Sequence, residues 1–255
     1  MRPHVICHMM ATIDGRIVTG RWPDLGDGWS EYERTAATLE ADAWMCGRIT
    51  MEAIAADVRE VKGTVPGGAP RPAGGAVRPV HPDRPVRPDF VAPGAKARYA
   101  VALDPRGRLI WEANDIDGDH IVAVLGERVP DEYLAGLRER GVSYLLVGAP
   151  AGEDAAHGQL DLAAALEKLL TVFGIRTLLL EGGGRINGAM LRAGLTDEVS
   201  LLVVPVADGA AGTPSLFDVA EEGQERSASR LALQSVERRA EDVLWLRYRV
   251  ESANE

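Results

Sequence analysis

An apolar segment that ends in a carboxylate and three glycines carries the residues best suited to chemistry. It reads Thr177-Leu-Leu-Leu-Glu-Gly-Gly-Gly-Arg-Ile-Asn-Gly-Ala-Met-Leu191, with Glu181 directly before Gly182, Gly183 and Gly184. Glycines let a chain turn sharply and approach a ligand closely, and the first N–H groups of a following helix lack intrahelical acceptors. A strand, a glycine turn and a helix in this order predict an anion site, which phosphate or pyrophosphate fits best.

The spacing of the glycines separates this site from two common nucleotide-binding motifs. Gly182, Gly184 and Gly188 span one residue more than the Rossmann fingerprint, and no Lys-Ser/Thr pair follows as in a P-loop. A tight turn without a ligand is the alternative for a bare glycine run. Glu181 favours a ligand, because a carboxylate at a strand end is well placed to accept hydrogen bonds from the N–H groups of a ring.

Composition narrows the classes of protein that fit. The chain has 255 residues, 46% of them hydrophobic, and a net charge of -10, which together predict a globular protein rather than a nucleic-acid binder. The sequence has no apolar run of membrane-spanning length, so we expect a cytoplasmic protein with no membrane partner. Cys7 and Cys46 lie in apolar runs and are expected to be buried thiols. The five histidines form no i, i+4 pair on a predicted helix and no Gly-x-Ser-x-Gly is present, so we expect neither a metal site nor a hydrolase elbow.

Helix and strand signals alternate along the chain. Helices are predicted over 30–40 (with Ser30 as N-cap), 50–58, 131–140, 161–173 and from the glycines to about 194, and strands over 5–10, 43–46, 98–103, 121–125, 143–147, 177–180 and 198–204. Residues 231–236 and 243–250 predict a hairpin. We therefore expect an α/β fold, a three-layer α/β/α arrangement with a mostly parallel central sheet and a C-terminal antiparallel hairpin. Residues 1–255 are predicted to form a single domain with a Pro/Gly-rich insertion at 61–97.

Four pieces of the chain, in this order, carry a family resemblance. They are Met10-Ala-Thr-Ile-Asp-Gly-Arg-Ile17, Asp42-Ala-Trp-Met-Cys-Gly-Arg-Ile-Thr50, Val101-Ala-Leu-Asp-Pro-Arg-Gly-Arg108, and residues 181–188 followed by 194–198. Together they resemble the dihydrofolate-reductase-like fold, and within it the reductase domain of riboflavin biosynthesis. The resemblance implies NADPH as cofactor, hydride transfer to a ribosylaminopyrimidine phosphate, and a homodimer paired through the sheet edge.

The resemblance also implies roles for individual residues. Those expected to bind the adenosine side of NADPH are Gly47, Arg48 and Thr50, with Arg48 near the 2′-phosphate, and Pro105 and Arg106 at the same end. The pyrophosphate is expected against Gly182, Gly183, Gly184, Arg185, Ile186 and Asn187, with the nicotinamide beside Glu181 and Trp29. The residues expected at the substrate are Thr12, Asp14, Asp27 and Glu181. The two strand-to-helix corners would then hold one dinucleotide between them.

Several of these roles have structural alternatives. Asp14 is also suited to capping its Asp-Gly turn, Trp29 to a place in the core, and Arg48 to a solvated surface. Dihydrofolate reductases place a carboxylate on the first helix to assist protonation of the pterin, and Glu31 or Glu33 fits that place. Both are equally suited to be first-turn acids that the helix dipole favours.

The chain departs from the riboflavin enzymes at two positions. Ile54 stands where an Asp is usual, and the place of a phosphate-binding arginine falls near Thr38, although Arg34 lies about one turn earlier. Three hypotheses follow: a reductase of the pyrimidine intermediate or a closely related heterocycle, a dihydrofolate reductase on the same fold, and a nucleotide-binding protein without catalysis.

Overall fold

A computed structural model describes residues 1–61, 87–95, 98–149, 160–218 and 228–251, with the side chains of 57–61 left out. These residues group into two compact units. Unit 1 comprises residues 1–2 and 46–175, and unit 2 comprises residues 3–45 and 176–255. The boundary falls inside strand β2 (Ala43–Gly47). The predicted insertion at 61–97 lies mostly outside the described residues.

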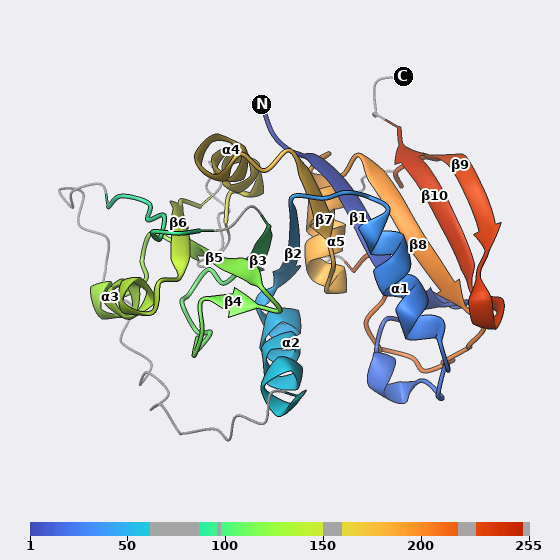
Figure 1. Ribbon diagram of the computed structural model, residues 1–255. Helices are drawn as coiled ribbons and strands as arrows, with labels where there is room; N and C mark the ends of the chain where they lie inside the picture. The colour runs from blue at the N-terminus through green and yellow to red at the C-terminus, as the bar shows by residue number, and fades with distance from the viewer. Residues whose placement is uncertain (62–86, 96–97, 150–159, 219–227, 252–255) are drawn as a thin grey trace. The chain divides into compact units, whose positions relative to one another are not determined.

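The sheet of unit 2 is parallel in its centre and antiparallel at one edge (Figure 1). Its strands run in the order β2, β7 (Thr177–Leu180), β1 (His4–Thr12), β8 (Glu198–Val204), β10 (Leu244–Val250) and β9 (Leu231–Arg238). Parallel registers place Cys7 beside Leu180 and Val199, and the antiparallel register places Trp245 beside Leu202. The C-terminal pair is the predicted hairpin.

Two helices cover the sheet of unit 2. Helix α1 (Gly28–Ala37) connects β1 to β2, and α5 (Gly184–Arg192) connects β7 to β8, so the two crossovers run in opposite directions along the sheet. Right-handed crossovers that run in opposite directions place their helices on opposite faces. Eight successive residues of β1 are buried, as expected of a strand covered on both sides. These layers confirm the predicted α/β class.

Unit 1 contains a second group of parallel strands. Strand β5 (Asp119–Gly126) pairs in parallel with β3 (Tyr99–Leu103) and β6 (Ser143–Val147), and antiparallel with the two-residue β4 (Asp115–Ile116). Its helices are α2 (Arg48–Val61), α3 (Asp131–Arg140) and α4 (Leu162–Phe173). Six successive residues of β5 are buried, so the strand lies in the core of this unit.

Local signals fixed some element bounds and missed others. Helix α3 and strands β6 and β8 have the predicted bounds, and the Asp161 carboxylate caps α4 by accepting the Ala164 N–H at 3.0 Å. The prediction of Ser30 as a helix N-cap was wrong, because α1 begins at Gly28 with Asp27 as N-cap. The reason is tertiary: Leu25 is buried, and its carbonyl oxygen accepts the Gly28 N–H at 2.9 Å, which starts the helix early. Strand β4 and the one-turn helices η1 (Thr19–Arg21) and η2 (Ala240–Asp242) were not predicted.

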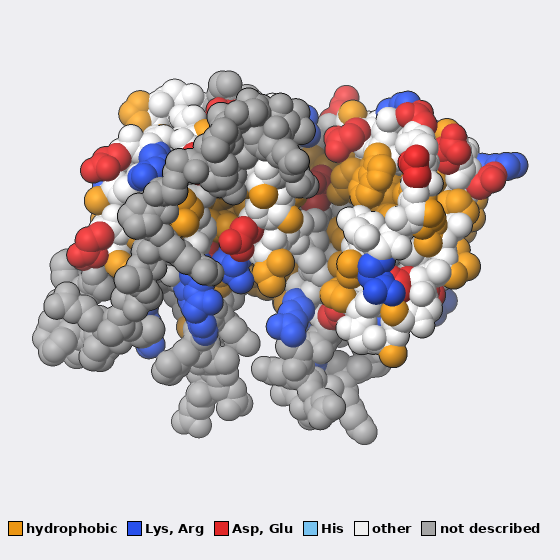
Figure 2. All heavy atoms as spheres, turned by 90° about the horizontal axis from the view of Figure 1, so that it is seen from below, with side chains coloured by type: hydrophobic (Ala, Val, Ile, Leu, Met, Phe, Trp, Pro, Cys, Tyr) orange, Lys and Arg blue, Asp and Glu red, His pale blue; other side chains and the backbone are white. Residues whose placement is uncertain are grey.

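The cysteines and the surface agree with the composition. Cys7 and Cys46 are buried thiols that form no disulfide, as predicted. Figure 2 shows acidic, basic and apolar side chains interspersed over the described part of one face. Among the described residues, no helix has both the length and the apolar character needed to cross a membrane.

Candidate active site

The glycine corner of unit 2 is formed as the sequence predicts. Glu181 directly follows β7, and its N–H donates to the Met45 carbonyl oxygen at 2.8 Å, which holds the corner in register with β2. Gly182 has a φ of +102°, a conformation that side chains rarely allow, and the Gly182–Gly183 peptide is cis. The chain therefore turns away from the sheet at the position where three glycines stand.

Helix α5 begins at this corner. The Gly183 carbonyl oxygen accepts hydrogen bonds from the amides of Ile186 at 2.9 Å and Asn187 at 3.2 Å. The amides of Gly184 and Arg185 precede these bonds at the positive end of the helix dipole, where helices bind anions. Arg185 is exposed and adds a positive charge to the same turn. This helix end thus has the donors that a pyrophosphate requires.

Residues 213–218, which we call the strap, lie against α5. The Asp218 N–H donates to the Gly184 carbonyl oxygen, and the Asn187 side-chain nitrogen donates to the Leu216 carbonyl oxygen, each at 3.0 Å. Asn187 is fully buried, so its backbone amide and its side-chain nitrogen both act within the protein. The strap therefore accounts for the side-chain nitrogen of a residue that the sequence assigned only to the cofactor, while the side-chain oxygen is buried without a hydrogen-bond partner.

The strap also explains two of the glycines. A Cβ atom on Gly184 would lie 2.1 Å from the Ser215 carbonyl oxygen, and one on Gly188 would lie 2.2 Å from the Asp218 carbonyl oxygen. Neither position accepts a side chain unless the strap moves. Sequence reasoning assigned the glycine spacing to a ligand, whereas a backbone segment about thirty residues later in the chain fills the space beside α5.

The polar groups at the end of β1 form hydrogen bonds with neighbouring residues of the protein. The Thr12 hydroxyl donates to the Asp14 carboxylate at 2.6 Å and accepts the Arg16 N–H at 2.9 Å. Asp14 also accepts the backbone N–H groups of Asp208 at 3.1 Å and Gly209 at 2.9 Å. The Thr12 hydroxyl and these two amides lower the pKa of Asp14 to about 2. Asp14 thus connects the end of β1 to the loop after β8, which is more than the local turn cap weighed from the sequence.

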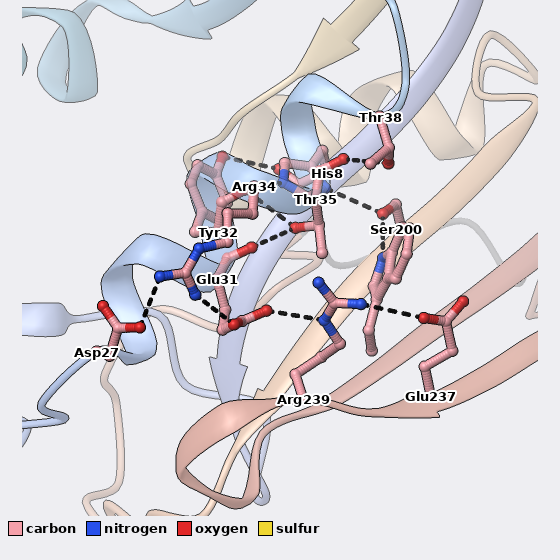
Figure 3. A network of polar contacts seen from close by, with 11 residues as sticks. His8, Asp27, Glu31, Tyr32, Arg34, Thr35, Thr38, Ser200, Glu237 and Arg239 are labelled. Atoms are coloured by element: carbon pink, nitrogen blue, oxygen red, sulfur yellow. Dashed lines mark hydrogen bonds and ion pairs between the residues drawn. The ribbon is translucent and has the colours of Figure 1, made fainter.

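A cluster of charged residues joins α1 to the C-terminal hairpin (Figure 3). Arg34 donates to the carboxylates of Asp27 at 2.6 Å and Glu31 at 2.5 Å, and the Arg239 Nε donates to Glu31 at 2.7 Å. The Glu31 side chain is only 6% exposed. Hydrogen bonds from Arg239 and Arg34 hold the pKa of Glu31 below its usual range despite burial. Glu31 is therefore a carboxylate and does not fit the role of proton donor, and Glu33 lies exposed on the surface.

Two tryptophans stack beside the start of α1. The rings of Trp22 and Trp29 have centroids 6.0 Å apart and planes 17° apart. Trp29 is 47% exposed, so it is not the core aromatic that the sequence allowed. An exposed ring supported from behind by a second ring is suited to contact a planar heterocycle.

A buried histidine lies beneath α1. His8 Nδ1 is 3.0 Å from the Ser200 hydroxyl, which accepts the Trp245 indole N–H at 2.8 Å, and His8 Nε2 is 3.3 Å from the Tyr32 carbonyl oxygen. Because the Tyr32 carbonyl oxygen can only accept, the proton of the neutral ring belongs on Nε2, and the Ser200 hydroxyl then donates to Nδ1. Desolvation, opposed by the Tyr32 carbonyl, lowers the pKa of His8 to about 4. His8 is therefore neutral and joins β1, β8, β10 and α1.

The predicted adenosine-side residues begin unit 1. Gly47 ends β2 and Arg48 is the first residue of α2, so the helix starts two residues before the predicted Thr50. The Arg48 side chain is 31% exposed and donates to Glu52 at 2.9 Å along the helix. Arg48 is thus a half-buried cation at a helix N-terminus, rather than a fully solvated one.

Asp104 organises the turn that carries Pro105 and Arg106. Its carboxylate accepts the N–H groups of Arg108 at 2.5 Å and Leu109 at 2.7 Å, while its other oxygen is buried without a hydrogen-bond partner. Burial raises the pKa of Asp104. Arg106 is exposed at the tip of the turn, and the Pro105 carbonyl oxygen accepts a hydrogen bond within the unit.

Sequence reasoning did not identify three residues that shape the site. Arg239 lies 208 positions from Glu31 in an ordinary charged run, and Asp218 and Ser215 stand in no recognisable motif. The glycines opposite the strap were the one signal of a close approach, and they were assigned to a ligand. Within the residues that the structure describes, no three His, Cys, Asp or Glu side chains gather as metal ligands.

Comparisons with known proteins agree with this architecture. The chain is 30% identical over 247 residues to 2,5-diamino-6-ribosylamino-4(3H)-pyrimidinone 5′-phosphate reductase of Methanothermobacter thermautotrophicus, covering 96% of this chain and 97% of that protein. It is 32% identical over 136 residues to the protein of the same name from Aquifex aeolicus, covering 49% of this chain and 55% of that one.

Solved structures show the same fold at lower identity. A pyrimidine reductase-like protein from Corynebacterium diphtheriae aligns with a TM-score of 0.63 at 14% identity, over 98% of this chain and 92% of that one. RibD from Acinetobacter baumannii aligns with a TM-score of 0.60 at 18% identity, over 98% of this chain but 58% of that longer protein. The sequence model of the RibD C-terminal domain matches residues 3–245. The chain therefore belongs to the RibD C-terminal domain family.

Proposed function

We propose that this protein is an NADPH-dependent reductase of the ribosylaminopyrimidine phosphate intermediate of riboflavin biosynthesis. The observation that carries the proposal is the 30% identity to a named pyrimidinone phosphate reductase along 96% of the chain. The family model matches one continuous stretch, 3–245. This supports the prediction of a single reductase domain over 1–255.

The two strand-to-helix corners have groups that fit parts of the cofactor. At the α5 corner, the amides of Gly184 and Arg185 and the Arg185 guanidinium fit a pyrophosphate. At the α2 corner, Arg48 and the helix N-terminus fit the 2′-phosphate that distinguishes NADPH from NADH. When bound, a reduced nicotinamide supplies the hydride, so the protein's task is to position the two rings and exclude water.

The substrate side offers carboxylates and an aromatic surface. Asp27 is half exposed, and the Ser30 hydroxyl and the Arg34 guanidinium lower its pKa, so it is a hydrogen-bond acceptor at neutral pH. Amino and ring N–H groups of a diaminopyrimidinone are the matching donors. Trp29 provides the neighbouring ring surface. Glu31 is paired with two arginines and Glu33 lies exposed on the surface, so neither has the surroundings of a buried proton donor, which disfavours the dihydrofolate alternative.

The test is the loss of NADPH absorbance with three substrates offered separately. These are 2,5-diamino-6-ribosylamino-4(3H)-pyrimidinone 5′-phosphate, its deaminated uracil counterpart and dihydrofolate. Turnover of either pyrimidine phosphate supports the proposal, and turnover of dihydrofolate alone contradicts it. NADPH binding by calorimetry without turnover of any substrate favours the non-catalytic alternative. The homodimer and the cytoplasmic location stay predictions, and light scattering of the purified protein tests the first.

A further inference from the structure

We propose that Arg239, on the C-terminal hairpin, is a positioning residue that leaves Arg34 free to hold the Asp27 carboxylate toward the substrate. The inference rests on the proposed function, in which Asp27 accepts hydrogen bonds from the heterocycle. Hydrogen bonds connect Arg239 to Asp27 through Glu31 and Arg34, a path drawn in Figure 3.

The path begins with a buried charge that needs a partner. The Glu31 side chain is 6% exposed, and an ionised carboxylate in such a place is costly unless cations compensate it. Arg239 Nε at 2.7 Å and Arg34 Nη1 at 2.5 Å supply two. A nearby arginine therefore pairs with Glu31 in preference to an exposed carboxylate, because Glu31 would otherwise be a buried charge without a partner.

Arg34 is shared between this buried carboxylate and an exposed one. Its Nη1 donates to Glu31 and its Nη2 donates to Asp27 at 2.6 Å, where both side chains are about half exposed. An exposed ion pair is weak, so Asp27 is the partner that Arg34 gives up when Glu31 loses its other cation. Removal of Arg239 is therefore expected to draw Arg34 onto Glu31 and release Asp27.

Arg239 itself is held by the hairpin. Its guanidinium carbon lies 5.7 Å from the centre of the Trp245 ring. Trp245 is buried, and its indole N–H donates a hydrogen bond to the Ser200 hydroxyl. Its Nη1 also donates to Glu237 at 3.2 Å. The ring contact and the bond to Glu237 hold the guanidinium beside the hairpin, and from there its Nε reaches Glu31 on α1.

The first experiment measures steady-state kinetics of Arg239→Ala, with Arg238→Ala as matched control. Arg238 is the neighbouring arginine, is exposed and pairs with Asp242. We expect Arg239→Ala to raise the KM for the pyrimidine phosphate about tenfold, as loss of a charged hydrogen bond would, with kcat and the KM for NADPH unchanged. Arg239→Lys should keep the KM for the pyrimidine phosphate close to that of the wild type, and Arg238→Ala should match the wild type.

The decisive variant is Glu31→Gln/Arg239→Ala. A neutral glutamine in place of Glu31 does not need Arg34 as a counter-ion. The double variant should therefore have a KM for the pyrimidine phosphate within about twofold of that of Glu31→Gln alone. It also has no unpaired buried charge, so it carries the test even where Arg239→Ala fails to fold. The proposal is overturned if Arg239→Ala still raises the KM for the pyrimidine phosphate tenfold when Glu31→Gln or Asp27→Asn is already present.

A second readout does not depend on turnover. Carboxyl NMR titration, with Asp27→Asn to assign the signal, should show the pKa of Asp27 rising toward its ordinary value in Arg239→Ala and not in Arg238→Ala. An unchanged Asp27 titration refutes the positioning role even if no substrate is reduced. Absence of turnover in the wild-type protein refutes the proposed function instead, so the two failures are distinguishable.

Discussion

Substitution of Gly188 by alanine separates two opposite expectations for helix α5. Gly188 is the fifth of nine helical residues, so helix propensity alone predicts that alanine stabilises the protein by about 1 kcal/mol. In the structure, however, the new Cβ would lie 2.2 Å from the Asp218 carbonyl oxygen and 2.9 Å from its carbon. Ordinary contact begins near 3.4 Å, so the strap would have to move by more than 1 Å.

The magnitude follows from these opposing effects. Overpacking against backbone costs about 3 kcal/mol at the upper end of its usual range, and the propensity gain offsets about 1 kcal/mol of that. We expect Gly188→Ala to lower the free energy of unfolding by about 2 kcal/mol, which is a fall in Tm of roughly 4–8 °C for a chain of this size. Urea unfolding followed by circular dichroism measures the first quantity, and calorimetry measures the second.

Gly136→Ala in helix α3 is the matched control. A Cβ there would approach only the far end of the Arg140 side chain, at 3.2 Å, so the propensity gain should appear as a stabilisation of up to about 1 kcal/mol. If Gly188→Ala stabilises the protein as Gly136→Ala does, the strap does not approach α5 as described. The glycine spacing would then require the ligand explanation that the sequence suggested.

Three further predictions concern charge and burial. His8 has a folded pKa of about 4 against about 6.5 when unfolded, so its contribution to stability is complete above pH 6.5 and is lost as the pH falls toward 4. The free energy of unfolding, measured with urea, should therefore fall by about 2 kcal/mol between pH 6.5 and pH 5. His8→Gln should remove this part of the pH dependence. Arg48→Ala should raise the Kd for NADPH about tenfold in calorimetry and leave that for NADH nearly unchanged, and equal losses for both would show that Arg48 does not contact the 2′-phosphate. Asp104→Ala leaves the buried Leu109 amide and the partly buried Arg108 amide without an acceptor and should destabilise the protein by about 3 kcal/mol. Asp104→Asn keeps one acceptor oxygen and should cost less, and similar costs for both would mean that the turn does not depend on these bonds.

Local patterns in the sequence determined most of the elements. Helix α3 ends at Gly141 and α4 at Gly174, where each glycine takes the left-handed cap conformation, and Asp161 caps the start of α4 through its own side chain. Apolar runs gave the buried parallel strands such as β5. These features could be read directly because a cap, a turn or a buried strand depends on residues within a few positions of one another.

Only the tertiary structure decided how the candidate site residues are used. The sequence identified the glycine corner and Asp27, but it could not show that the strap fills the space beside Gly184, or that Arg239 and Arg34 divide the charge of Glu31. Contacts of this kind join residues tens to hundreds of positions apart, and whether a carboxylate acts as an acid or as a fixed anion depends on its burial and its partners. The sequence therefore determined which elements and functional groups exist, whereas the packing of distant segments determined their protonation, their accessibility and their partners, because free energies of burial and ion pairing depend on distances in space.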